Sequence, residues 1–261
     1  MKYLLISTLA LLTIYSSAAF GQDPKSDVNK LHIRDGSVEI YFIPGKSDSS
    51  HQNYKVLFAP GDGGWRGFAI TIAQNIASWG YDVYGLDTKQ YLSEYTGDST
   101  LNENEIMSDF GEIARYMKPT INHGVILAGW SEGAGLCLLG AASDSNKSLI
   151  NGLVTIGLPD SSVMGWRFID NLTYLTKKNP NEKMFASANY LASVSPLPIF
   201  MIQSTGDEYI TVDGAKAMFS IAKEPKRFEI VQSKNHKFGG NTDQFFDTLK
   251  EGIEWTKKTS Q

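Results

Sequence analysis

Short apolar runs alternate with amphipathic stretches along most of the chain. Seven apolar runs bounded by turn-forming residues predict strands, at residues 38–43, 55–58, 81–86, 124–128, 152–156, 199–203 and 227–231. Apolar residues at helical spacing predict helices between them, at residues 68–78, 103–117, from 132 onward, 215–221 and 242–255. Strands that alternate with helices predict an α/β fold, with a mostly parallel sheet and helices on both of its faces.

The chain from residue 22 to residue 261 shows no break in composition, so we expect one folded domain. Residues 161–195 interrupt the alternation of strands and helices and contain Trp166. Connections this long inside a compact domain are often functional, so we expect this segment to form a short cap over a site. Helices on the surface of the domain are the alternative.

The first 21 residues have the pattern of a secretory signal peptide. Lys2 precedes an apolar run that ends in small residues, with cleavage expected after Gly21 or Ala19. The run is too short to cross about 30 Å of hydrocarbon comfortably, which disfavours a membrane anchor. We therefore expect a periplasmic or secreted protein.

Composition excludes several classes of function. The chain has 24 Lys and Arg against 28 Asp and Glu, for a formal charge of −4, so we expect no nucleic-acid partner. Cys137 is the only cysteine and lies in an apolar stretch, where we expect it to pack as a small hydrophobic residue. One cysteine and four scattered histidines disfavour a metal site, and we expect no metal and no cofactor.

The clearest chemical motif is Gly129-Trp130-Ser131-Glu132-Gly133, which follows a predicted strand and opens a predicted helix. The Gly-x-Ser-x-Gly pattern is weak by itself, but this context is that of a nucleophile elbow, a sharp turn that exposes the serine hydroxyl. The start of the helix also directs free N–H groups toward developing negative charge. The alternative is a tight turn in which Ser131 only caps the helix.

A serine nucleophile needs a base, which is nearly always a histidine. His236 follows the last predicted strand, so it lies at the edge where the carboxyl ends of the strands meet and where functional residues gather. His32 and His51 precede the main sheet, and His123 lies at the opposite end of the strand that leads to Ser131. We therefore predict that His236 is the base.

The histidine in turn needs a carboxylate to orient it. Asp207 follows the strand at residues 199–203 and emerges at the same edge as His236. The order serine, aspartate, histidine is the order found in nucleophile-elbow hydrolases. Asp207 is our predicted acid, and Asp160 and Glu208 are the alternatives.

An oxyanion hole needs two N–H donors. The first expected donor is the backbone of Glu132, directly after the nucleophile. The second comes from a glycine-rich loop after an early strand, where we choose Asp62 over its neighbours; this loop lacks the Lys-Ser/Thr pair of a phosphate-binding loop. Together with the elbow, the same loop should line the substrate pocket, with Gly61, Gly63, Gly64, Trp65 and Trp130.

These motifs resemble the α/β-hydrolases over nearly all of the chain after residue 21. More narrowly, Gly61-Asp62-Gly63-Gly64-Trp65-Arg66, Gly85-Leu86-Asp87 with Tyr91, and the elbow resemble the family of the bacterial virulence protein VirJ and the carboxyl-terminal domain of AcvB. The resemblance implies an exported α/β-hydrolase with Ser131, Asp207 and His236 as its triad. It also implies either cleavage of an aminoacyl-lipid ester, as for AcvB-type members, or contact with secretion-system components, as for VirJ.

We therefore expect a serine esterase that acts on a small-molecule or lipid ester, with contact to a membrane surface or a secretion component. The alternative is a non-catalytic binding or chaperone module of an envelope secretion system. The elbow departs from the family pattern Tyr-Ser-Phe because Glu132 follows the serine. That carboxylate either favours a cationic ester or is simply solvated at the start of the helix.

Overall fold

The computed structural model describes residues 27–46, 54–117, 124–172 and 181–260. The predicted signal peptide at residues 1–21 lies outside these ranges. The main strands are β1 (Asp27–Ile33), β2 (Gly36–Ile43), β3 (Tyr54–Ala59), β4 (Asp82–Leu86), β5 (Gly124–Trp130), β6 (Gly152–Ile156), β9 (Ile199–Ser204) and β10 (Lys226–Val231). The main helices are α1 (Phe68–Ser78), α2 (Thr88–Glu94), α3 (Glu103–Met117), α4 (Glu132–Ala142), α7 (Val212–Phe219) and α8 (Thr242–Thr259).

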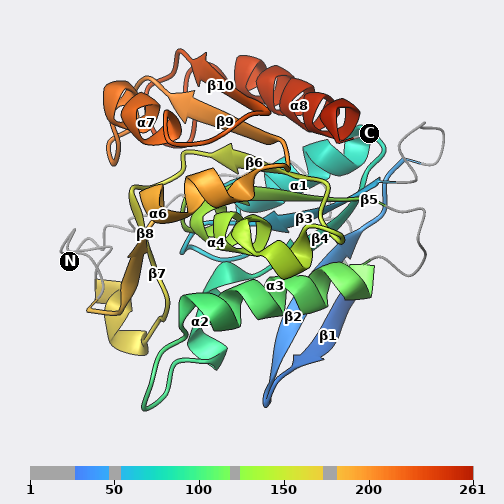
Figure 1. The fold of residues 1–261 in the computed structure, drawn as a ribbon, viewed down its shortest axis with the longest axis vertical. Coiled ribbons are helices and arrows are strands. Elements are labelled where there is room, and N and C mark those ends of the chain that lie inside the picture. Colours follow the sequence, from blue (N-terminus) through green and yellow to red (C-terminus); the bar gives the residue numbers. More distant parts are fainter. Residues whose placement is uncertain (1–26, 47–53, 118–123, 173–180, 261) are drawn as a thin grey trace, which may run out of the picture.

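These eight strands form one sheet in the order β1-β2-β4-β3-β5-β6-β9-β10 (Figure 1). Within the described part of this sheet, β2 runs antiparallel to both of its neighbours, and the other neighbouring pairs are parallel. The mostly parallel sheet expected from the sequence is therefore confirmed.

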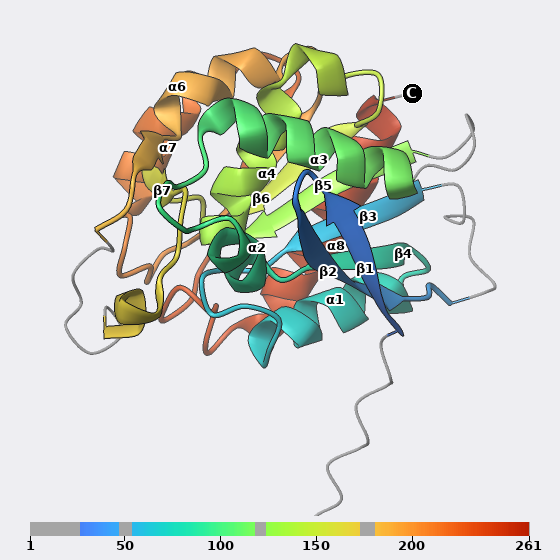
Figure 2. The same cartoon turned by 90° about the horizontal axis from the view of Figure 1, so that it is seen from below.

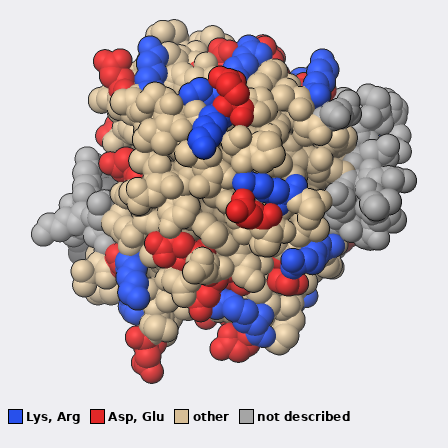
Figure 3. All heavy atoms as spheres, in the orientation of Figure 1, with Lys and Arg blue, Asp and Glu red and all other residues tan. Residues whose placement is uncertain are grey.

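Helices cover both faces of the sheet (Figure 2). Helices α3 and α4 lie on one face and α1 and α8 on the other, and each pair encloses its own apolar core. Cys137 in α4 is fully buried, and burial raises the pKa of its thiol well above the ordinary range, so it packs as a small hydrophobic residue. Among the described helices none is long and apolar enough to cross a bilayer. Figure 3 shows the described acidic and basic side chains interspersed on one face of the molecule.

The sequence patterns missed two elements, β1 and α2. Strand β1 is an edge strand that pairs with β2, and its first four residues are exposed, so it lacks the apolar alternation that marks a strand. Helix α2 has only seven residues and begins at a cap, where the Asp87 carboxylate accepts the backbone N–H of Gln90. Local hydrogen bonding defines this helix more than apolar periodicity does.

The described parts of the 161–195 segment form a small layer of their own. Strands β7 (Ser161–Val163) and β8 (Met184–Ala186) pair antiparallel and pack beside α4 and α6 (Ala188–Leu191). Two 3₁₀ turns, η2 (Phe168–Leu172) and η3 (Ala192–Val194), complete it. Strands β7 and β8 and turn η2 lie on the side of α2, whereas α6 and η3 pack against α4 (Figures 1 and 2). Its role as a cap stays a prediction.

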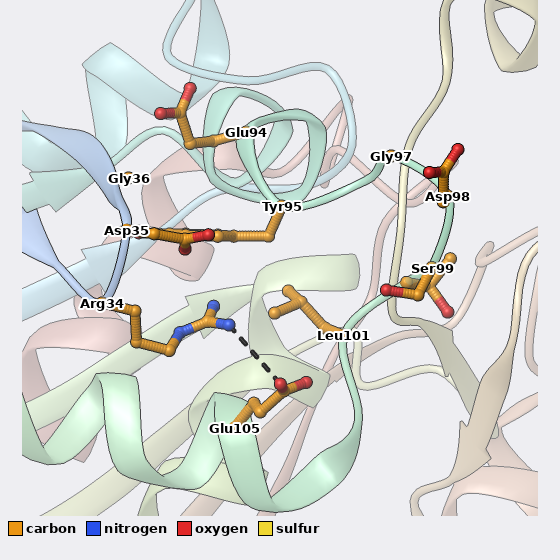
Figure 4. Close-up of a pocket in the computed structure, with 11 residues that line it drawn as sticks. Arg34, Asp35, Gly36, Glu94, Tyr95, Gly97, Asp98, Ser99, Leu101 and Glu105 are labelled. Atoms are coloured by element: carbon orange, nitrogen blue, oxygen red, sulfur yellow. Dashed lines mark ion pairs between the residues drawn. The ribbon is translucent and has the colours of Figure 1, made fainter.

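A buried charge cluster ties the β1–β2 turn to the rest of the fold. Arg34 donates two hydrogen bonds to the Asp109 carboxylate, at 3.0 and 2.9 Å, and the hydroxyl of Tyr91 donates a third at 2.7 Å. The Arg34 guanidinium also lies 4.0 Å from the centroid of the Tyr95 ring and 3.6 Å from the Glu105 carboxylate (Figure 4). The cluster borders a hollow of about 350 Å³, and it holds a carboxylate that is only 1% exposed.

Replacing Arg34 with alanine is expected to lower the free energy of unfolding by about 3 kcal/mol, because Asp109 would keep a buried carboxylate without its cationic partner. Urea denaturation measures this loss. The matched control is Arg115→Ala, which removes an exposed ion pair with Glu112 and should change stability by less than about 1 kcal/mol. If the two substitutions changed the free energy of unfolding equally, the Arg34 cluster would not stabilise the fold more than an exposed ion pair does.

Candidate active site

Ser131 lies at a sharp turn between β5 and α4. Its backbone has φ 56° and ψ −125°, a left-handed conformation that non-glycine residues rarely adopt. At Gly133 a Cβ atom would lie 2.1 Å from the carbonyl oxygen of Ala59, so the turn can pass this close to β3 only with glycine there. The Ser131 side chain makes no capping hydrogen bond to α4. Ser131 occupies the N-cap position of α4, but capping by its side chain does not explain the serine there.

Asp207 and His236 are hydrogen-bonded to each other at the carboxyl edge of the sheet. Nδ1 of the imidazole lies 2.7 Å from Oδ2 of Asp207, whose side chain is 1% exposed. The other carboxylate oxygen accepts the backbone N–H groups of Tyr209 (2.9 Å) and Ile210 (3.3 Å). Burial alone would raise the pKa of Asp207, but His236 and these two N–H groups hold it below its ordinary value. Asp207 therefore stays ionised and accepts the Nδ1 proton.

The imidazole of His236 lies beside the elbow. Its ring is stacked on that of Trp130, the residue before Ser131, with 5.7 Å between the ring centroids and 27° between the planes. Its Nε2 atom is buried and has no hydrogen-bond partner within the part of the chain that the structure describes. One ring nitrogen is thus held by a carboxylate, and the other makes no hydrogen bond to the Ser131 hydroxyl or to any other group among the described residues.

The alternative acids do not contact the imidazole nitrogens. The Glu208 carboxylate instead accepts the backbone N–H of His236 at 2.9 Å, which fixes the loop that carries the histidine. Asp160 is exposed, and its carboxylate accepts the hydroxyl of Ser161. His32 lies in β1 and contacts Ser37, whereas residues 51 and 123 lie outside the described ranges.

Gly157 is a part of the site that the motif analysis missed. It follows β6 at the same edge as Asp207 and His236 and has φ 56°. A Cβ atom there would lie 2.6 Å from Cε1 and 3.0 Å from Nδ1 of His236, so a larger residue would displace the imidazole. A glycine directly after a predicted strand of the functional edge is the signal that could have identified it.

The glycine-rich loop lies next to Ser131. A Cβ atom on Gly61 would be 3.1 Å from Cβ and 3.6 Å from Oγ of Ser131. The adjacent Asp62 is partly buried, and burial raises the pKa of its carboxyl group, although the charge of Lys89 and the N–H of Gly63 act in the opposite direction. The position of the loop is compatible with an oxyanion hole made of the Asp62 and Glu132 amides.

Comparison with solved structures identifies the fold. The match to the α/β hydrolase GrgF from Penicillium sp. sh18 covers 90% of this chain and 98% of GrgF, at 14% identity and a TM-score of 0.64. The match to Est1E from Butyrivibrio proteoclasticus with bound ferulic acid covers 87% of this chain and 98% of Est1E, at 11% identity and a TM-score of 0.62. The chain has the α/β-hydrolase fold. A further hydrolase-fold structure, XC6422 from Xanthomonas campestris, described as a serine hydrolase without lid, covers 88% and 95%, at 15% identity and a TM-score of 0.58.

Two family models of bacterial proteins linked to virulence match separate parts of the chain. The family model of the bacterial virulence protein VirJ matches residues 53–158, which include the glycine-rich loop and the elbow, so the expected resemblance to VirJ is confirmed over this range. The model of the PhoPQ-activated pathogenicity-related protein matches residues 169–259. The uncharacterized protein YfhR of Escherichia coli (strain K12) is 34% identical over 55 residues, which are 21% of this chain and 19% of YfhR. The match therefore spans about a fifth of that curated relative.

The structure shows the contacts of the two tryptophans that the sequence places in a substrate pocket. The Trp65 ring stacks on Tyr41, with 4.9 Å between centroids, and packs against the backbone of Gly85. It therefore lies against β2 and β4, while Gly64 and the Trp65 N–H lie against the Asp87 carboxylate. Trp130 packs on the imidazole of His236, the predicted base. The spacing of the motifs could not show either orientation.

Glu132 is turned toward the 161–195 segment of the chain. Its Oε1 atom accepts the backbone N–H of Val163 in β7 at 2.5 Å. Burial raises the pKa of Glu132 to about 8, against the effect of that hydrogen bond, and the charge of Asp62 raises it further. Glu132 is partly buried and hydrogen-bonded to β7, so it is not a freely solvated glutamate. A raised pKa weakens the support for the selection of a cationic ester.

Replacing Glu132 with glutamine is expected to flatten the dependence of stability on pH between about 4.5 and 8. The folded-state pKa of about 8 exceeds the ordinary value of 4.5, so the protonated Glu132 carboxyl group favours the folded state. This contribution to the free energy of unfolding is complete below about pH 4.5 and is lost as the pH rises through 8. The wild type should lose at most about 1.4 kcal/mol per pH unit over this window, a loss that Glu132→Gln cannot show. Thermal unfolding across this range measures it, with Glu112→Gln as the exposed control; identical pH profiles would contradict the assignment.

A second hollow, of about 420 Å³, lies between α2 and the 161–195 segment. Residues of both contribute to its lining, which is formed by Lys89, Ser93, Thr96, Trp166, Arg167, Phe168 and Asn171. Thr88, which precedes Lys89, donates a hydrogen bond to the carbonyl of Pro60 at 2.6 Å, so the hollow lies near the start of the glycine-rich loop. Within the described ranges, no group of three or more His, Cys, Asp or Glu side chains is arranged to hold a metal ion.

Proposed function

We propose that the protein is an exported serine hydrolase that cleaves a carboxylic ester through an acyl-enzyme. The observation that supports this most is the 2.7 Å hydrogen bond between Asp207 and His236, next to a serine held at a strained elbow. A buried carboxylate that orients an imidazole beside such a serine is the arrangement that activates a hydroxyl group. Export is proposed from the sequence pattern of residues 1–21.

In this mechanism Ser131 Oγ attacks the ester carbonyl carbon while Nε2 of His236 takes the hydroxyl proton. The Asp207 carboxylate holds the Nδ1 proton and stabilises the imidazolium cation. The backbone N–H groups of Glu132 and Asp62 bind the oxyanion of the tetrahedral intermediate. Nε2 then donates its proton to the leaving alcohol, and the acyl group stays on Ser131.

Water completes the cycle. A water molecule attacks the acyl carbon of the ester on Ser131 and gives a proton to Nε2 of His236. This attack forms a second tetrahedral intermediate at the acyl carbon. When this intermediate collapses, the Ser131 oxygen leaves and regains its proton from Nε2. The carboxylic acid product departs, and both side chains return to their starting states.

We further propose a lipid ester, such as an aminoacyl-lipid, as the substrate. Support comes from apolar side chains exposed on the 161–195 segment: Phe168 is 93% exposed and Ile169 is 62% exposed, and Leu172 lies in the same turn. Phe168 also lines the hollow near the glycine-rich loop. Apolar side chains gathered on one protruding turn suit contact with acyl chains or a membrane surface.

Hydrolysis of p-nitrophenyl esters of increasing chain length, run beside lysyl-phosphatidylglycerol, tests this function. We expect turnover that rises with acyl chain length or is highest on the lipid. Phe168→Ser should lower turnover of the long-chain and lipid substrates and leave the shortest ester unchanged, because Phe168 lies outside the triad. Turnover confined to short esters would contradict the lipid substrate, and no turnover of any ester would contradict esterase activity.

The second candidate is a non-catalytic binding module of an envelope secretion system, which the match to the VirJ model supports. One scaffold can host unrelated functions, so the hydrolase fold alone does not decide between the two. A binding module has no chemical need for a buried Asp207–His236 pair, and this favours the enzyme. Two results together would favour the binding module. The wild type would show no ester turnover, and a Ser131→Ala variant would bind a secretion component as well as the wild type does.

A further inference from the structure

We propose that Trp130 is a positioning residue that holds the imidazole of His236 in its working orientation. This inference rests on the proposed serine hydrolase activity, but it concerns a residue outside the triad. The x position before a nucleophilic serine carries no chemical requirement of its own in the Gly-x-Ser-x-Gly pattern. In this chain its side chain forms a stacked contact with the catalytic base.

The indole is itself held in place by other aromatic rings. Phe68 of α1 meets the Trp130 ring edge-on, with 5.2 Å between centroids and 84° between planes. Phe68 packs in turn on Phe245 and Phe246 of α8, at 5.7 and 6.3 Å. Rings from two helices therefore fix the indole, and edge-on and stacked pairs of this kind are favourable beyond the apolar area that they bury.

The other contacts of the imidazole leave a role for this stack. The hydrogen bond from Nδ1 to Asp207 holds one atom of the ring, and Glu208 holds only the backbone N–H of His236. A ring held at one atom can still tilt about that atom. Tyr209 meets the imidazole edge-on at 5.0 Å, but its side chain is 76% exposed and gives no rigid support. The fixed face of Trp130 therefore restricts the tilt, together with the close approach of Gly157 to the ring.

The position of Trp130 in the chain strengthens this role. It is the last residue of β5, directly before Ser131, so one short stretch of backbone carries both the nucleophile and the support of the base. A displacement of the imidazole by about 1 Å can cost about 100-fold in rate. The identity of residue 130 is therefore expected to affect kcat far more than the binding of the substrate.

The test compares Trp130→Leu, Trp130→Phe and Trp255→Leu. Trp130→Leu should lower kcat about 10- to 100-fold with little change in KM, whereas Trp130→Phe keeps a flat ring and should stay within about threefold of the wild type. Trp255 is also partly buried and packs on Phe200, with 5.8 Å between centroids, so Trp255→Leu controls for a general loss of packing. Thermal unfolding of each variant shows that it is folded.

A second measurement does not depend on turnover: the exchange with water of the Nδ1 proton of His236, followed by NMR as a low-field signal. We expect this exchange to be at least tenfold faster in Trp130→Leu than in the wild type, Trp130→Phe and Trp255→Leu. Unchanged exchange together with unchanged kcat in Trp130→Leu would overturn the inference. If the wild type shows no Ser131-dependent turnover, the proposed function fails, and the proton exchange alone still decides whether Trp130 positions the imidazole.

Discussion

Replacing Ser131 with alanine is expected to lower kcat for ester hydrolysis by about 10⁴- to 10⁶-fold, because the members of a triad act as a unit. Alanine removes only the hydroxyl group that would attack the carbonyl carbon. That hydroxyl makes no capping hydrogen bond to α4, so its loss should leave the fold intact. Steady-state hydrolysis of the best ester of the p-nitrophenyl series measures the effect.

Ser143→Ala is the matched control, because Ser143 lies at the other end of α4 and its hydroxyl contacts only that of Ser145 among the described residues. This control should keep wild-type turnover. A Ser131→Ala protein that retains more than about a hundredth of wild-type kcat would show that the elbow serine is not the nucleophile. The hydrolase fold would then support a different function at this edge.

Replacing Asp207 with asparagine is expected to lower kcat by about 10⁴-fold, the magnitude known for the equivalent change in a serine protease triad. The neutral amide cannot replace the charged carboxylate that accepts the hydrogen bond from Nδ1–H. The imidazole is then no longer held in the tautomer with its proton on Nδ1, and its cation is no longer stabilised. The pKa of Asp207 in the folded state lies below its ordinary value. The ionised carboxylate therefore stabilises the fold at any pH above the ordinary pKa, and this stabilisation is lost as the pH falls through the folded-state pKa. Thermal unfolding near neutral pH should therefore also show a less stable variant.

Asp160→Asn is the control for this substitution. Asp160 lies near the same edge of the sheet, but its carboxylate is exposed and contacts Ser161. We expect wild-type kcat in Asp160→Asn and a large loss in Asp207→Asn. The reverse result would exchange the roles of the two aspartates, and equal, small effects would remove the carboxylate from the mechanism.

The sequence predicted the elements of the fold that depend on apolar periodicity. The seven predicted strands correspond to β2, β3, β4, β5, β6, β9 and β10, and the five predicted helices to α1, α3, α4, α7 and α8. Strand β1 was missed because an edge strand with exposed side chains carries no apolar pattern. Local patterns thus identify elements that bury a face, and they miss those held by pairing or by a cap.

The same limit applies to the site. Asp207 and His236 were predicted because both follow strands whose carboxyl ends meet at one edge, and the structure places their side chains in contact. The direction of a side chain next to a motif is set by tertiary packing, so the sequence could not show that Trp65 turns toward Tyr41 or that Glu132 turns toward β7. Gly157 was missed for a related reason, because its constraint comes from His236, 79 positions farther along the chain.

The most direct test of the account is to treat the purified protein with a fluorophosphonate and to map the modified residue by mass spectrometry. The account predicts one covalent adduct, on the hydroxyl oxygen of Ser131, whose formation slows by about 10⁴-fold or more in a His236→Ala variant. A folded protein that forms no adduct, or that forms one on a residue other than Ser131, would contradict the proposed nucleophile.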